Sequence, residues 1–121
     1  MELSQKLQIK PGQKVATLTG PVDRPAALED GWELADSPET ADVVLAFVRL
    51  QADLDTVAAP AIAAALDDRL AWIAYPKAGN LGTDLNRDIL SDLLTARSVR
   101  PVRQVAIDDI WSALRFRPAS S

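Results

Sequence analysis

The sequence predicts an α/β domain of three layers, with a mostly parallel sheet and a C-terminal antiparallel hairpin. Apolar runs typical of buried strands alternate along the chain with segments of helical periodicity, which is the pattern of such a domain. Residues 43–48 are continuously apolar, as in a central parallel strand that is covered on both faces. The last two strand-like runs, 102–107 and 111–116, lie at hairpin spacing. A chain of 121 residues buries one core, so we expect a single domain over residues 1–121.

The first expected elements are a short helix and a buried strand. Leu3 and Leu7 lie one helical turn apart, and Pro11-Gly12 must end that helix. Residues 15–19 then have the composition of a buried strand.

The region after this strand predicts a shortened helix and an ambiguous run. Pro25 suits the first position of a helix and Gly31 its end, so residues 26–30 are expected to form one short helix. Only residues 37–40 separate the run at 32–36 from the central strand, whereas a parallel crossover takes about a dozen residues or more. That run is therefore either an edge element or no true strand.

A helix is predicted after residue 54, because apolar side chains recur there on one helical face. These residues, mostly alanines that allow close packing on a sheet, are Val57, Ala58, Ala61, Ile62, Ala65 and Leu66. Pro60 lies off this face, but inside a helix it costs about 3 kcal/mol. We therefore expect a kink or a fresh helix start near residue 60.

The second half of the chain adds a strand at 70–75 and a further helix. Thr83 or Asp84 is expected to cap this helix, which should end near residues 96–98, and its apolar residues lie four apart: Leu85, Ile89 and Leu93.

The tryptophans and one acidic pair have expected structural roles. Trp72 and Trp111 lie in predicted strands and should fill the core, whereas Trp32 lies near the ambiguous run and should mark a partly exposed contact surface. Asp108 and Asp109 are adjacent, so in a strand they would point to opposite faces and form no catalytic pair. We expect them in the hairpin turn.

Several segments resemble known protein families. Residues 9–15 look like the lead-in to the first strand of class I methyltransferases, and residues 41–45 look like their central strand. Residues 75–77, 83–88 and 107–116 resemble a bacterial family of small uncharacterised proteins, a domain of unknown function, and this match spans nearly the whole chain. The resemblance implies a compact, three-layer, Rossmann-like sheet of the methyltransferase type. That family has no established activity, so the resemblance implies a fold and not a reaction.

The loop after the first strand predicts that no cofactor is bound. A dinucleotide or nucleoside cofactor needs a close backbone approach and free N–H groups there, which glycine-rich loops provide. Residues 19–25 hold one glycine, and Pro21 and Pro25 each lack a backbone donor and fix φ. S-adenosylmethionine would also need an acidic residue after the second strand. Asp36 is the candidate for this role, but an acidic residue at a strand end is ordinarily a turn former.

Composition excludes several classes of function. The net charge is −4 and there is no basic run, which disfavours nucleic acid and anionic membranes as partners. The chain has no stretch of about eighteen apolar residues and no signal pattern at its start, so we expect a cytoplasmic protein. The absence of cysteine excludes disulfides and thiolate chemistry, and the absence of histidine removes the commonest general base and metal ligand. The sequence therefore predicts neither catalytic residues nor a metal site.

The segment 76–84 is the best candidate for a ligand site. It follows a strand and opens a helix, where free N–H groups and glycines favour an anion, and ligands of open α/β sheets gather at strand ends. The expected ligand residues are Lys77, Gly79, Asn80, Gly82 and Thr83, with Arg49 at the same edge. The spacing is not that of a phosphate loop. The structural alternative is an ordinary capped connection in which Lys77 is solvated and Asp84 pairs with Arg87.

These observations leave three interpretations of function. The first is a non-catalytic, protein-binding or regulatory module whose partner the sequence does not identify. The second is a binder of a small anion or nucleotide at residues 77–84. The third is a minimal S-adenosylmethionine-dependent methyltransferase.

Overall fold

A computed structural model describes residues 3–19, 33–77 and 80–119. The strands of these residues, in chain order, are β1 (Lys14–Thr19), β2 (Glu33–Leu34), β3 (Val43–Phe47), β4 (Leu70–Pro76), β5 (Val99–Ala106) and β6 (Trp111–Pro118). The α-helices are α1 (Leu3–Lys6), α2 (Ala59–Leu66) and α3 (Arg87–Thr95), and short 3-10 helices are η2 (Pro38–Thr40), η3 (Gln51–Asp55) and η4 (Asn80–Gly82). The expected helix at 26–30, Trp32 and Gly79 lie outside the described residues.

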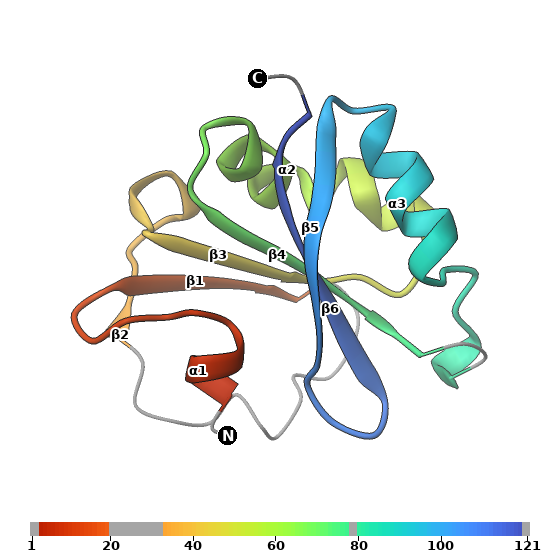
Figure 1. The fold of residues 1–121 in the computed structure, drawn as a ribbon, viewed down its shortest axis with the longest axis horizontal. Coiled ribbons are helices and arrows are strands. Elements are labelled where there is room, and N and C mark those ends of the chain that lie inside the picture. Colours follow the sequence, from red (N-terminus) through yellow and green to blue (C-terminus); the bar gives the residue numbers. More distant parts are fainter. Residues whose placement is uncertain (1–2, 20–32, 78–79, 120–121) are drawn as a thin grey trace.

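The strands form one six-stranded mixed sheet of order β2-β1-β3-β4-β6-β5 (Figure 1). The pairings β1–β2, β1–β3 and β3–β4 are parallel, and β4–β6 and β5–β6 are antiparallel. The antiparallel pairings run along most of their strands, whereas β1–β2 joins only Lys14 to Glu33 and Val15 to Leu34. The antiparallel end therefore makes up a large part of this sheet.

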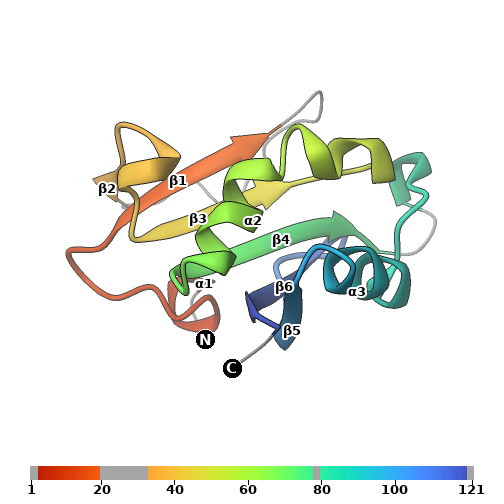
Figure 2. The same ribbon diagram turned by 90° about the horizontal axis from the view of Figure 1, so that it is seen from above.

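The prediction of a mostly parallel, three-layer, Rossmann-like sheet is wrong. Figure 1 shows α2 and α3 together above the sheet, and Figure 2 shows them again on one side of it. Below the sheet, the one α-helix in the described part of the chain is the four-residue α1. The hairpin is also longer than the apolar pattern indicated, because β5 begins before Pro101. At the outer edge of a sheet, a proline removes no ladder hydrogen bond.

Several local predictions are confirmed. All five residues of β3 are buried. Pro60 lies in the first turn of α2, which starts afresh after η3. The ambiguous run at 32–36 contains a two-residue edge strand, β2. Asp108 lies in the hairpin turn, where its Oδ1 accepts hydrogen bonds from the backbone N–H groups of Ile110 (2.8 Å) and Trp111 (2.7 Å).

Each face of the sheet has its own apolar core. Under α2 and α3, alanines of α2 and leucines of α3 pack against buried residues of the sheet. On the α1 side, Trp72 and Trp111 are buried as expected, and the ring of Phe47 meets that of Trp111 edge to face with centroids 5.2 Å apart. The Trp72 Nε1 donates to the Leu7 carbonyl (3.0 Å), which ties the end of α1 to the sheet.

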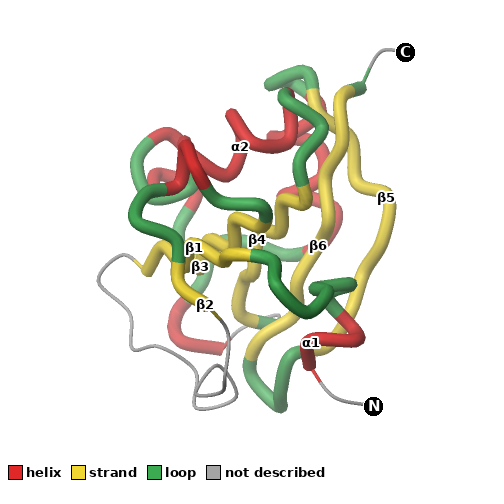
Figure 3. Tube along the Cα trace, turned by 90° about the vertical axis from the view of Figure 1, so that its left-hand side faces the viewer, coloured by secondary structure: helices red, strands yellow, loops and turns green. Residues whose placement is uncertain are grey.

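Strand β5 forms one edge of the sheet (Figure 3) and carries a β-bulge. Its register joins Pro101 to Phe116 and Arg103 to Arg115, so Val102 has no partner residue on β6. Near the other end of β5, the Lys6 ammonium donates to the Ala106 carbonyl (3.3 Å).

Within the described residues, no helix combines the length and the apolarity needed to cross a membrane.

Candidate functional site

The loops that follow β3 and β4 lie against each other at one edge of the sheet; we call residues 48–55, 77 and 80–86 the loop cluster. Arg49 follows β3, and its Nη1 donates to the Leu81 carbonyl (3.2 Å). The Thr83 hydroxyl in turn donates to the Arg49 carbonyl. Gly82 lies beside this arginine, since a Cβ there would be 3.6 Å from its Nη1. Three of the residues predicted to bind a ligand, Arg49, Gly82 and Thr83, are therefore brought together.

Polar groups of the loop cluster bond mainly to one another. Asp53 Oδ2 accepts from the N–H groups of Arg49 (3.1 Å) and Leu50 (3.0 Å). Asp84 Oδ1 accepts from the Gln51 N–H (2.8 Å), and Gln51 Nε2 donates to the Asp84 carbonyl (3.2 Å). Internal bonds of this kind brace two loops and leave fewer donors for a bound anion.

The backbone N–H groups after β4 also donate to other groups of the protein. The N–H of Asn80 donates to the Lys77 carbonyl (2.9 Å), that of Thr83 to the Asn80 carbonyl (3.1 Å) and that of Leu85 to the Thr83 hydroxyl (3.0 Å). The Lys77 N–H donates to the Ile110 carbonyl (2.7 Å), and the Lys77 side chain is half-buried.

Two local predictions about this loop are wrong. The N-cap of α3 is Asn86, whose Oδ1 accepts from the Ile89 N–H (2.8 Å), rather than Thr83 or Asp84. The i, i+3 pair between Asp84 and Arg87 is also absent, and the Arg87 Nε lies 3.4 Å from Asp88 instead. The helix begins later than the apolar spacing suggested, so Asp84 lies before its first turn and bonds to η3.

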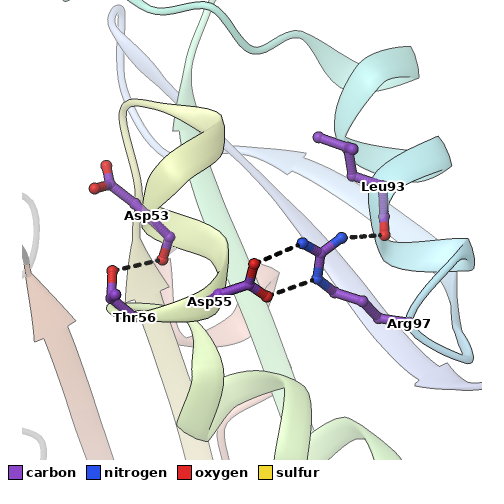
Figure 4. A network of polar contacts seen from close by, with 5 residues as sticks. All are labelled: Asp53, Asp55, Thr56, Leu93 and Arg97. Atoms are coloured by element: carbon purple, nitrogen blue, oxygen red, sulfur yellow. Dashed lines mark hydrogen bonds and ion pairs between the residues drawn. The ribbon is translucent and has the colours of Figure 1, made fainter.

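A second brace ties η3 to the end of α3 (Figure 4). The Arg97 guanidinium donates twice to the carboxylate of Asp55, at 3.1 Å each, and once to the Leu93 carbonyl (2.7 Å). The hydrogen bond from Arg97, and then its charge, lowers the pKa of Asp55. In the same turn, the Thr56 hydroxyl donates to the Asp53 carbonyl (3.4 Å). The guanidinium of Arg97 is thus matched by a carboxylate.

Asp36 lies beside a cavity of about 240 Å³ between β1 and the residues that follow β2, where Thr17, Ser37 and Pro38 also line it. Elsewhere, burial raises the pKa of Tyr75, whose hydroxyl accepts from Gln104 Nε2 (3.3 Å). Among the residues that the structure describes, no group of three or more His, Cys, Asp or Glu is arranged to hold a metal ion.

The β5–β6 hairpin carries a surface that the sequence analysis missed. Five of the 13 basic residues but only two of the 17 acidic residues lie within residues 97–117. The five are Arg97, Arg100, Arg103, Arg115 and Arg117.

Four of these arginines lie on one face of the hairpin; we call Arg100, Arg103, Arg115 and Arg117 the arginine face. The register places Arg100 opposite Arg117 and Arg103 opposite Arg115, and side chains of directly opposed residues lie on the same face. This is the α1 side of the sheet, because the alternation along β6 puts these arginines on the face of the buried Ala113. Cβ atoms of opposed residues are about 4.5–5.5 Å apart, so the four charges are crowded.

Charge compensation on this face is incomplete. Arg117 forms a bidentate pair with Asp68, at 2.9 and 3.1 Å. Arg115 instead donates to the neutral side-chain amide of Gln8 (2.8 Å), and its Nε is buried with no hydrogen-bond partner. Burial, followed by the charges of Arg117 and Arg103, lowers the pKa of Arg115. Arg100 and Arg103 are exposed, and no described carboxylate pairs with either.

The clustering of arginines in the last quarter of the sequence was the available signal for this surface. Their shared face was not visible, because Arg100 and Arg103 are three residues apart and an unbroken strand would turn them to opposite faces. The bulge at Val102 brings them to the same face.

No protein-family model matches this chain, and no curated protein sequence matches it significantly. The resemblance to the bacterial family and to methyltransferases therefore stays a prediction.

Proposed function

We propose that this chain is a non-catalytic binding module that docks an acidic segment of another protein on the arginine face. The observation that carries the proposal is that two pairs of arginines lie directly opposite each other, Arg100 with Arg117 and Arg103 with Arg115; we call each pair a rung. Within the described residues, Arg117 is the one member of these pairs that has a carboxylate partner. Like charges directly opposite one another destabilise a sheet, so stability does not account for this arrangement. Arginine is suited to the role because its planar guanidinium binds carboxylates through two parallel hydrogen bonds.

The acidic partner is supported by the charge distribution and by the chain's own ion pairs. The arginines gather on one face of the hairpin, although the net charge of the chain is −4. A local positive patch of this kind attracts and orients a negatively charged partner. Arg97 and Arg117 each hold an aspartate in bidentate geometry, which is the contact proposed for the partner. The absence of histidine and cysteine from the sequence favours binding over catalysis. The cytoplasmic location stays a prediction.

Fluorescence anisotropy with a labelled glutamate-rich peptide tests the proposal. The double variant Arg100→Gln/Arg103→Gln should weaken binding by at least about tenfold, which corresponds to ~1.4 kcal/mol. The control Lys14→Gln/Arg87→Gln also removes two positive charges, but away from the arginine face, and should bind like the wild type. Equal affinity of the wild type and the Arg100/Arg103 variant would contradict the proposal.

The alternatives rank behind this proposal because the polar groups of the loop cluster largely satisfy one another. If Lys77 helps to bind an anion, sulfate should raise the melting temperature beyond an ionic-strength control, and Lys77→Ala should lose the saturable part of that shift. For the methyltransferase interpretation, calorimetric titration with S-adenosylmethionine and nucleotides is decisive. Saturable binding that Asp36→Ala abolishes would move the function to the cavity beside β1.

A further inference from the structure

The Arg103–Arg115 rung is the centre of the uncompensated charge. Arg117 on the neighbouring rung already holds Asp68, and its opposite residue Arg100 has no described carboxylate partner. Three guanidinium groups, those of Arg100, Arg103 and Arg115, therefore share one small surface, and Asp68, the described carboxylate whose charge acts on Arg115, is already paired with Arg117. A single carboxylate would neutralise only part of this charge.

We infer that the acidic segment presents a phosphorylated serine or threonine to Arg103 and Arg115, an inference that rests on the function proposed above. A phosphoryl group carries about −1.5 to −2 charges at pH 7 and three strong acceptor oxygens. The exposed Arg103 offers that group a guanidinium fork, and Arg115, whose Nη1 already donates to Gln8, adds a second positive charge directly opposite. Clusters of arginine are a general means of recognising a phosphoryl group. Arg100, on the next rung, adds a third positive charge beside the bound group.

The bulge at Val102 makes this recognition possible. In a regular strand with no bulge, Arg103 would lie three residues beyond Arg100 on the opposite face of the sheet, and the pair Arg103–Arg115 would not form. Bulges re-aim side chains at sheet edges in this way. The position of a single unpaired residue thus determines how many guanidinium groups meet the ligand.

A phosphorylated protein is favoured over a nucleic acid. Proteins that bind single strands stack bases on exposed aromatic rings. The aromatic residues of the described part of the chain are all buried: Phe47, Trp72, Tyr75, Trp111 and Phe116. A net charge of −4 also opposes the approach of a long polyanion, while a short segment with one dianionic group contacts only the local arginines.

Three short labelled peptides that differ at one central position test the inference by anisotropy: one carries serine, one glutamate and one phosphoserine in an otherwise identical acidic sequence. The phosphoserine peptide should bind at least about tenfold more tightly than the glutamate peptide. Arg103→Gln should remove most of this difference, and Arg103→Lys should retain only part of it, because lysine keeps the charge without the fork. Arg87→Gln is the matched control and should change neither affinity. Arg103 is exposed, and thermal melts will show that its variants fold.

A pH series adds a second readout. The phosphoryl group titrates near pH 6, so its advantage over glutamate should shrink between pH 7 and pH 5. The charged groups around the rung are Lys6, Arg100, Arg103, Arg115, Arg117 and Asp68, and the glutamate peptide measured at the same pH values serves as the control for any change in them.

The outcomes separate this inference from the proposed function. Equal affinity for the glutamate and phosphoserine peptides, with both lost in Arg100→Gln/Arg103→Gln, would overturn phosphate recognition and leave the docking function standing. Absence of binding to all three peptides would overturn both. Preference for a single-stranded oligonucleotide, dependent on the same arginines, would replace the protein partner with a nucleic acid.

Discussion

The loop cluster and the arginine face differ in where their polar atoms find partners. At the loop cluster, the Arg49 guanidinium bonds to a neighbouring carbonyl, and Asp53 and Asp84 accept from backbone N–H groups. On the arginine face, Arg103 lacks a described partner and Arg115 retains a buried unpaired nitrogen. A region whose donors and acceptors match internally stabilises the fold, whereas a region with crowded like charges is suited to an external ligand. Substitutions in the loop cluster should therefore lower stability, whereas substitutions on the arginine face should weaken binding and leave stability nearly unchanged.

The largest effect should come from the core that underlies the arginine face. Trp72→Ala should lower the free energy of unfolding by about 3–5 kcal/mol, because it removes a buried indole and its bond to the Leu7 carbonyl. Trp111→Ala should cost a similar amount. Denaturant unfolding measures both, and Trp72→Phe, which keeps much of the apolar contact, should cost less. Midpoints near that of the wild type for both alanine variants would mean that these rings do not support the hairpin.

A smaller loss of stability should follow from one hydroxyl of the loop cluster. Thr83→Val removes the group that donates to the Arg49 carbonyl and accepts from the Leu85 N–H, and should cost about 1–3 kcal/mol. Thr83→Ser keeps the hydroxyl and is the matched control. If the valine variant unfolds at the same denaturant concentration as the serine variant, the loop cluster does not depend on this hydroxyl. The statement that internal hydrogen bonds of the loop cluster stabilise the fold would then be wrong.

The arginine face should behave in the opposite way. Arg103→Gln should change the free energy of unfolding by no more than about 0.5 kcal/mol, and toward greater stability, because it relieves repulsion with Arg115. The same denaturant measurement applies. A loss above about 1 kcal/mol would show that the arginine supports the fold, and would remove the distinction between the two regions.

The smallest effect concerns acid pH. Hydrogen bonds from Arg97 and Arg117 lower the pKa values of Asp55 and Asp68 below the ordinary 3.8. A carboxyl with a lowered pKa in the folded state contributes stability above its unfolded pKa, and this contribution disappears as the pH falls through the folded value. Stability should therefore decline below about pH 4, with a slope that Arg117→Gln reduces. Arg100→Gln, which removes an exposed charge with no described carboxylate partner, should leave the slope unchanged.

Much of the local structure could be predicted because single residues determine it. Residues 43–48 are apolar without interruption, Pro60 sets the start of α2, and Asp108 forms the turn of the hairpin. The length of the antiparallel part of the sheet could not be predicted, because the apolar run covers residues 102–107, whereas β5 begins at Val99, before Pro101. An edge position tolerates that proline, and periodicity alone does not show where the edge lies.

The candidate site was less predictable than the fold. Proximity of Arg49 to residues 81–83 follows from strand order, which the sequence pattern suggested. The hydrogen bonds within the loop cluster could not be predicted from strand order, because they depend on the backbone geometry of the loops. The arginine face could be identified only from the register of β5 and β6 and from the bulge, and the spacing of the arginines in the sequence predicts neither.

The outer side of β5 has a consequence for how copies of this chain meet. An exposed edge strand offers unpaired N–H and C=O groups on which a second chain can extend the sheet, a common start of aggregation. Here Pro101 supplies no N–H, the unpaired Val102 distorts the strand, and the Lys6 ammonium bonds to the Ala106 carbonyl. These features shorten the stretch of β5 on which a neighbouring strand can pair.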